Sequence, residues 1–141
     1  MREGDVFPKR RVVVHHSASP RDRTTAHDIA SWHTDRGFDM IGYNYVIEAG
    51  GKLVVGRSMH RAGAHCKADG ANFDSIGICV TGDNTKPSEA WDQDQIEALR
   101  TFVQSARVLF PGISVCGHRD VPGAKTACPG VDIVDLLSGV I

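Results

Sequence analysis

The stretch from Cys116 to Pro129 places an imidazole and a thiol in one segment that contains Pro and Gly. Its candidate ligands, His118 and Cys128, lie ten positions apart (128 minus 118), and the loop between them could bring both side chains to one point. Imidazole nitrogen and thiolate sulfur are donors that zinc prefers. A catalytic zinc site usually has three protein ligands and keeps a further position for water. The stretch therefore predicts two ligands of a metal site whose third ligand comes from elsewhere in the chain.

The other histidines are the first candidates for that third ligand: His15, His16, His27, His33, His60 and His65. The first two end a β-branched run, Val12–Val14, that is typical of a buried strand, and strand ends are where α/β folds present reactive groups. Adjacent side chains on a strand point to opposite faces, so we expect only one of the pair to face the site. Periodicity does not choose between them. His27 and His33 fall on a predicted helix and are expected to be solvated or partly packed. For His60 and His65, in the predicted loop, both metal ligation and simple solvent exposure stay open.

The elements that would position these residues alternate between strands and helices. Apolar and β-branched runs predict strands at 11–16, 42–48, 53–55, 75–81 and 113–116, and helical periodicity with capping residues predicts helices at 24–36, 92–110 and 132–137. The turn at 49–52 should pair the second and third strands as an antiparallel hairpin. Residues 56–74 show no period and are expected to form a long, functional loop. This order predicts an α/β fold, a single domain with a central mixed β-sheet flanked by helices.

Length and composition limit the classes of function. At 141 residues the chain fits one domain, and its formal net charge of −1, from 16 basic and 17 acidic residues, argues against nucleic acid as a partner. Residues 1–8 lack the apolar core of a secretory signal, and no apolar run approaches the length of a membrane span. There is no Cys-x-x-Cys pair, and Cys66, Cys79 and Cys116 are predicted to be packing thiols. We expect a protein made in the cytoplasm without a signal peptide and without membrane insertion.

Short motifs in a fixed order resemble a known family. They are Val13–Ser19, Trp32–His33, Gly42–Ile47, Gly63–His65, Asn72 with Ser75–Ile78, Gly117–Asp120 and Ala127–Gly130. Their order and spacing resemble the zinc-dependent N-acetylmuramoyl-L-alanine amidases of the phage-lysozyme type, which are related to peptidoglycan recognition proteins. The resemblance covers roughly residues 11–137. It implies a single amidase domain, 1–141, with Zn²⁺ as cofactor and peptidoglycan as partner, and no separate wall-binding domain is expected.

The resemblance also implies roles for individual residues. It makes His15, the first histidine of the pair, the ligand that completes the zinc site with His118 and Cys128. Tyr43 matches a tyrosine that stands beside the zinc in this family, where it would hydrogen-bond the attacking water or the developing oxyanion. Tyr45 should face the other way and pack.

Two residues just before Cys128 are further catalytic candidates. The phage enzyme that this chain resembles has a lysine two positions before the cysteine, whereas Thr126 stands here and Lys125 lies one residue further back. Threonine donates a hydrogen bond without a charge, so we expect Thr126, with Lys125 as the alternative, to stabilise charge on the substrate carbonyl oxygen. His65 and Asn72 are the candidates for contacts with the glycan or the stem peptide. A solvent-exposed loop histidine and a turn-forming asparagine explain them equally well.

The implied activity is zinc-dependent hydrolysis of the amide bond between N-acetylmuramic acid and L-alanine. We expect a monomeric phage or prophage endolysin that waits in the cytoplasm until the membrane is permeabilised and then acts on the cell wall. A cytoplasmic muropeptide-recycling amidase is one alternative, and a peptidoglycan recognition module without turnover is another, although the intact ligand set argues against the latter. Binding to a polymerase is a third possibility, tied to no feature of the sequence. A generic zinc peptidase is disfavoured because there is no His-Glu-x-x-His motif.

Overall fold

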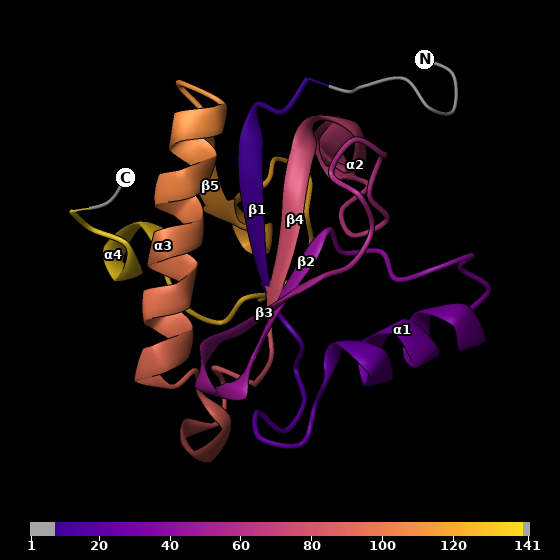
Figure 1. The fold of residues 1–141 in the computed structure, drawn as a ribbon, viewed down its shortest axis with the longest axis vertical. Helices are drawn as coiled ribbons and strands as arrows, with labels where there is room; N and C mark the ends of the chain where they lie inside the picture. The colour runs from indigo at the N-terminus through magenta and orange to yellow at the C-terminus, as the bar shows by residue number, and fades with distance from the viewer. Residues whose placement is uncertain (1–7, 140–141) are drawn as a thin grey trace.

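The computed structural model describes residues 8–139 and shows a mixed five-stranded sheet with helices on both of its faces (Figure 1). The strands are β1 (Arg11–His16), β2 (Tyr45–Glu48), β3 (Lys52–Val55), β4 (Ser75–Val80) and β5 (Ser114–Gly117), and the helices are α1 (Ala26–Asp35), α2 (Ala71–Asp74), α3 (Gln93–Leu109) and α4 (Ile133–Leu136). The strand order is β3-β2-β4-β1-β5. Strand β1 runs parallel to both β4 and β5, β2 runs parallel to β4, and only β2 and β3 pair antiparallel. The expected α/β fold and its hairpin are confirmed. The absence of a secretory signal was expected from residues 1–8, of which residues 1–7 lie outside the described residues.

The second strand and the following loop differ from the sequence-based expectation. The strand expected at 42–48 begins only at Tyr45, because the Asn44 side chain takes a place in the ladder: its Oδ1 accepts from the Gly77 N–H at 2.8 Å. The segment expected to be an irregular loop, 56–74, ends in a 3₁₀ turn and the short helix α2. These begin where Asp69 and Gly70 adopt φ values of 54° and 69°, a backbone conformation that hydrophobic periodicity does not reveal.

The two longer helices begin at capping boxes. Thr25 accepts from the N–H of Asp28 while the Asp28 carboxylate accepts from the Thr25 N–H, and Asp92 and Gln95 do the same for α3. Each arrangement satisfies two of the backbone donors that a helix start leaves open. The first box fixes the start of α1 at Ala26, so that the helix follows closely on the end of β1.

The two faces of the sheet have different contents. Val12 and Val14 belong to the large core under α3, which also contains Leu99 and Val103, both fully buried. Burial of an aliphatic side chain of this size stabilises the fold by about 1.5–3 kcal/mol. Val13 points the other way, into a smaller cluster. Because side chains alternate along a strand, His15 shares the face of Val13 and lies on the side of the sheet away from α3.

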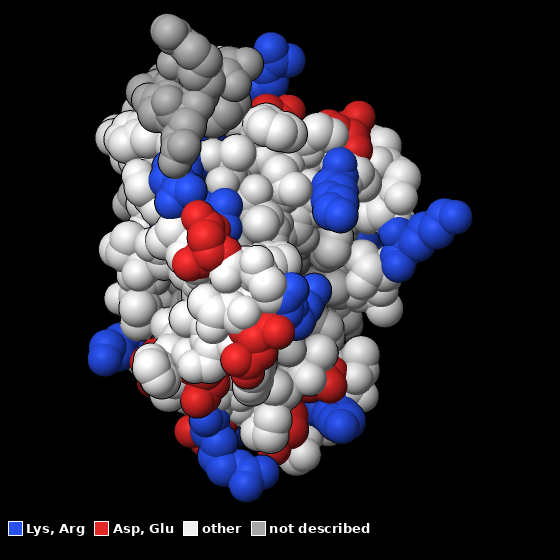
Figure 2. Space-filling model, turned by 90° about the vertical axis from the view of Figure 1, so that its right-hand side faces the viewer, with Lys and Arg blue, Asp and Glu red and all other residues white. Residues whose placement is uncertain are grey.

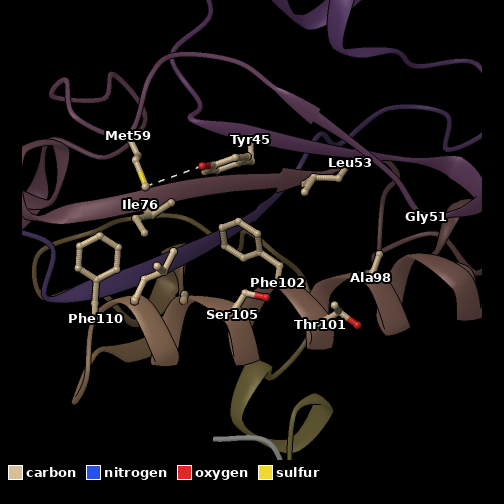
Figure 3. A pocket seen from close by; sticks show the side chains of 12 residues that line it. Tyr45, Gly51, Leu53, Met59, Ile76, Ala98, Thr101, Phe102, Ser105 and Phe110 are labelled. Carbon is tan, nitrogen blue, oxygen red and sulfur yellow. Dashed lines mark hydrogen bonds between the residues drawn. The ribbon is translucent and has the colours of Figure 1, made fainter.

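A cavity of about 450 Å³ lies on the α3 face, between the β2–β3 hairpin and α3 (Figure 3). Its lining is mostly apolar and includes Tyr45, whose ring packs 4.9 Å from that of Phe102. The expectation that Tyr45 packs on the face away from His15 is confirmed. The cavity is on the opposite face from His15, and it offers none of the candidate ligands.

Charged side chains of both signs are interspersed over the face that carries α1 and α2 (Figure 2). Arg11 lies 3.0 Å from a carboxylate oxygen of Asp69 and 3.0 Å from one of Asp74, and these pairs tie the start of β1 to the segment before β4. Lys9 is 8% exposed and donates to the Ser75 carbonyl. The start of β1 is therefore anchored by ion pairs and hydrogen bonds.

Within residues 8–139, no helix has the length and apolar character needed to cross a membrane.

Candidate metal centre

Three side chains from distant parts of the chain converge at one end of the sheet. His15 lies at the end of β1 and is 2% exposed, while the partly buried His118 follows β5 directly and the partly buried Cys128 comes from the loop beyond it. One ligand atom from each lies within 4.8 Å of the other two. The Cys128 Sγ is 3.8 Å from Nδ1 of His15, and the two imidazole centroids are 4.6 Å apart. Two nitrogens and one sulfur are thus brought together as a donor set.

Local contacts explain how the loop carries Cys128 back to the sheet. The Arg119 N–H donates to the Cys128 carbonyl at 2.7 Å, and the Asp120 carboxylate accepts from the Gly117 N–H at 3.0 Å. A Cβ at Gly117 would lie 2.7 Å from Cδ of Pro129, so only glycine permits this close approach. The turn after β5 and the cysteine are therefore fixed relative to one another.

His16 does not join the donor set, although it lies next to His15. Its ring points away, where Nδ1 accepts from the Asn84 N–H at 3.2 Å. Its backbone N–H donates to the Cys128 Sγ at 3.4 Å. Strand alternation therefore leaves one histidine for the donor set and lets the backbone of the other donate a hydrogen bond to the sulfur.

The donor set fits zinc chemically. Burial lowers the pKa of His15 well below its usual value and also lowers the pKa of His118, so both rings are neutral with a lone pair at neutral pH. Burial raises the pKa of the Cys128 thiol to about 11 in the absence of metal. A bound dication reverses that preference, since a coordinating thiol is deprotonated outright. Imidazole nitrogen with one thiolate matches the ligand set of a catalytic zinc site.

Tyr43 stands beside the donors. Its ring centroid is 5.0 Å from that of His15 and 5.4 Å from that of His33. Burial, together with Cys79 and Cys128 nearby, raises the pKa of Tyr43 well above its usual value. The phenol is therefore protonated at neutral pH and is a hydrogen-bond donor, not an anion.

His65 lies behind His15. Its Nδ1 is 2.8 Å from Nε2 of His15, and its own Nε2 is 3.1 Å from the Ser75 Oγ. Burial, with smaller contributions from His118 and nearby cations, lowers the pKa of His65 to about 3. The Asn72 Oδ1 accepts from the N–H groups of His65 and Cys66, each at 2.8 Å. Both candidates for substrate contacts are thus engaged in hydrogen bonds within the protein, and their contact with substrate stays a prediction.

Two further cavities flank the donor set. One of about 350 Å³ is lined by His118, His65 and Asn72, and the exposed side chains of Arg36 and Lys67 border it. A smaller one of about 120 Å³ is bounded by Tyr43 and also by Arg36. Both are smaller than the apolar cavity under α3, but the first is lined by the donor His118 and the second by Tyr43 beside the donors.

Thr126 and Lys125 lie exposed at the edge of the site. The Thr126 Oγ1 accepts from the Cys128 N–H at 3.1 Å. Because that bond uses an oxygen lone pair, the hydroxyl proton of Thr126 remains available to a substrate.

Several residues that support the site through hydrogen bonds or close packing were not predicted from the sequence to do so. Ser75 is fully buried and contacts the His65 ring, and Asn44, also fully buried, bridges β4 and the segment after β3. Gly77 faces the His65 ring. A glycine inside a predicted strand signals the close approach of another group and could have marked this position. The packing of Cys66, by contrast, is confirmed, as it is 3% exposed.

Fold and donor set together define a class: an α/β domain that brings two histidines and one cysteine together, residue types that zinc sites use as ligands. The family model described as N-acetylmuramoyl-L-alanine amidase matches residues 6–131. The chain belongs to this family.

Individual relatives agree with that assignment. The endolysin of Klebsiella phage KP32 is 30% identical over 126 residues, which cover 86% of this chain and 81% of the relative. An endolysin N-acetylmuramoyl-L-alanine amidase from Clostridium intestinale is similar in structure, with a TM-score of 0.77, 27% identity, and coverage of 89% of this chain and 78% of that one. A chain from the solved complex of tracheal cytotoxin with peptidoglycan recognition proteins LCa and LCx gives a TM-score of 0.76 at 29% identity, with coverage of 92% of this chain and 80% of that one. The family and the fold class expected from the sequence are confirmed.

Proposed function

We propose that His15, His118 and Cys128 bind a zinc ion, and that this site performs the reaction of the family, hydrolysis of the amide between the lactyl group of N-acetylmuramic acid and L-alanine. The observation that carries the proposal is the convergence of three donor atoms within 4.8 Å of one another in an N-acetylmuramoyl-L-alanine amidase fold. When bound, zinc would supply a Lewis acid and lower the pKa of water from about 16 towards about 7.

The side chains around the donors have separate tasks in this proposal. Tyr43, protonated and packed beside His15, donates a hydrogen bond to the attacking water or to the oxyanion that develops on the substrate carbonyl. Thr126 donates its free hydroxyl proton to the same carbonyl oxygen, and its bond from the Cys128 N–H orients that hydroxyl. Lys125 is the alternative donor. A thiolate ligand partly neutralises the metal, so hydrogen bonds of this kind carry more of the electrostatic stabilisation than they would beside three neutral ligands.

We place the substrate in the cavity of about 350 Å³ beside His118. His65 and Asn72 form part of its wall, and Arg36 and Lys67 add positive charge at its border. Cations there favour the carboxylates that peptidoglycan stem peptides carry. The solved complex of the two recognition proteins with tracheal cytotoxin supports a ligand of this class.

The decisive experiment compares metal content and activity in two cysteine variants. Cys128→Ser is expected to lose zinc and to leave purified sacculi intact, whereas wild type releases stem peptides with free L-alanine amino ends. Cys116→Ser is the matched control, because Cys116 packs in the cluster around Val13 and lies outside the donor set. Full zinc stoichiometry in Cys128→Ser would show that the metal site is wrong.

We further propose that the enzyme acts as an endolysin on the cell wall from the cytoplasmic side. The endolysins among its relatives support this role over muropeptide recycling. Expression in a bacterium should leave the culture turbid until the membrane is permeabilised with chloroform, and lysis should then follow within minutes in wild type and not in Cys128→Ser. Activity on free muropeptides with none on intact sacculi would favour recycling. Binding to sacculi without release of stem peptides would establish a recognition module.

A further inference from the structure

We propose that His65 and Ser75 are positioning residues that fix the tautomer of His15, so that His15 turns its Nδ1 lone pair towards the metal. This inference rests on the proposed metal site and adds to it. In this proposal His65 and Ser75 orient the proposed ligand His15 through hydrogen bonds.

The chain of hydrogen bonds begins at Ser75, which is fully buried. Its Oγ lies 2.5 Å from the Ala71 carbonyl oxygen and 3.1 Å from Nε2 of His65. A carbonyl oxygen only accepts, so the single hydroxyl proton of Ser75 lies on the bond to Ala71. The Ser75 oxygen is then an acceptor towards His65, and Nε2 of His65 must carry a proton.

The protonation of His65 determines that of His15. An imidazole is mostly neutral above its ordinary pKa of about 6.5, and a neutral ring with its proton on Nε2 has a lone pair on Nδ1. That Nδ1 is 2.8 Å from Nε2 of His15, which must therefore be the donor. The remaining nitrogen of His15, Nδ1, keeps its lone pair and lies 3.8 Å from the Cys128 Sγ. The direction of each bond thus follows from the one before it, starting from a backbone carbonyl.

The backbone around His65 is shaped to hold its ring in this place. A Cβ added to Gly77 would lie 2.5 Å from Nε2 of His65, and one added to Gly63 would lie 2.6 Å from its Cδ2. The Asn72 side chain holds the backbone N–H of His65 at 2.8 Å. The ring therefore lies directly against the backbone of β4, and a side chain at 77 would displace it.

Ligating histidines in metal sites commonly donate their second N–H to a carboxylate, a carbonyl or water. Here the acceptor is a neutral imidazole that is itself held by a serine. It orients His15 without bringing a negative charge next to the metal. The expected contribution is therefore to the geometry and affinity of the site, with no added charge to weaken the metal as a Lewis acid.

The first test reads the tautomers directly. Long-range ¹H–¹⁵N correlation spectra of ¹⁵N-histidine-labelled, metal-free wild type at pH 7.5 should show His15 and His65 both protonated on Nε2 and not on Nδ1. In Ser75→Ala the anchor of the chain is lost, and His65 should show a mixture of tautomers. A wild-type His15 with its proton on Nδ1 would overturn the proposal, whatever the activity of the protein.

The second test measures zinc affinity by competition with a chelator in paired variants. Asparagine can place an acceptor oxygen near the position of Nδ1, whereas leucine removes the acceptor and keeps the bulk. His65→Leu should bind zinc about 10–100-fold more weakly than wild type, and His65→Asn should recover at least about tenfold of that loss. Gly77→Ala, which displaces the ring without changing any polar side chain, should resemble His65→Leu. His27→Leu, on the exposed side of α1, is the control and should bind zinc as wild type does.

Folding is monitored separately by thermal unfolding of each metal-free variant, and affinities are compared only among variants that unfold cooperatively. If His65→Asn and His65→Leu lose affinity equally, the ring acts through packing alone and the proposal fails. The proposal also fails if His65→Leu binds zinc with the affinity of wild type. Failure of the proposed function looks different: wild type itself would bind no zinc or release no stem peptide, while the tautomers of the metal-free protein could still be read.

Discussion

The two halves of the donor set are built in different ways. His15 belongs to a strand with parallel partners on both sides, is almost completely buried, and has its ring held by His65. His118 and Cys128 lie on a partly exposed loop, where the geometry depends on the turn after β5 and on the close approach of Pro129. One half is part of the core, and the other is held against it.

This difference separates stability from metal binding. A buried ligand with a buried acceptor behind it contributes to the fold even without metal, because an unpaired acceptor in the interior costs free energy. A ligand on a partly exposed loop contributes through the metal. The same chemical loss, removal of one imidazole, should therefore have different consequences in the two halves.

The largest contrast is expected between His15→Ala and His118→Ala. Both should abolish amidase activity, since each removes one of three donors. Only His15→Ala should also destabilise the metal-free protein, by about 1–3 kcal/mol, because it leaves Nδ1 of His65 without its donor. Denaturant unfolding of the chelator-treated proteins measures this difference. Equal destabilisation by the two substitutions would contradict the division into a core half and a loop half.

The loop half should be most sensitive at Gly117. A methyl group there overlaps Cδ of Pro129 and must displace the segment that carries Cys128. We expect Gly117→Ala to weaken zinc binding about 10–100-fold, as disturbed ligand orientation does in other metal sites, with little change in the core. Chelator competition gives the affinity, and Ala127→Ser, an exposed change in the same loop, is the control. Unaltered affinity in Gly117→Ala would show that the loop accommodates the methyl group.

Acid should destabilise the metal-free protein mainly through the buried half. Burial lowers the pKa values of His15 and His65, the latter to about 3, so the folded state binds these protons less tightly than the unfolded chain does. Their contribution to stability is complete above the unfolded value of about 6.5 and is lost as the pH falls from there towards 3. Unfolding free energies at pH 7.5 and pH 5 should differ less in His65→Asn than in wild type. An equal pH dependence in both proteins would exclude His65 as a contributor.

The smallest effects are expected at the exposed end of the loop. Thr126→Val should lower the turnover number about 2–10-fold, the equivalent of one ordinary hydrogen bond, while zinc is retained. Lys125→Ala should change it less than about twofold, because an exposed charge is screened by solvent. Release of stem peptides from sacculi under saturating conditions measures both. If Lys125→Ala proves the more damaging change, the lysine is the donor to the carbonyl oxygen.

The sequence predicts the strands, the helices and the candidate ligands of this site better than it predicts the contacts that hold those ligands in place. Helical periodicity with capping residues predicts α3 closely, and β-branched runs predict β1, because these signals are local. The motifs around His15, His118 and Cys128 single out the residues that the structure brings together. The arrangement of His65 against His15 was not foreseen, because it depends on α2, on two residues with positive φ, and on the free space at Gly77. None of these features produces a periodic pattern of apolar residues in the sequence.

The 113 positions from His15 to Cys128 in the sequence also order events in time. At about 5–20 residues per second, a ribosome makes Cys128 about 6–23 s after His15. Throughout that interval the nascent chain has strand β1 and its histidine but not the thiol, and β5 is made only near the end of it. The complete donor set of the proposed site therefore exists only late in synthesis, and if that site binds zinc, the zinc content of ribosome-bound chains would report how much of the domain has already folded.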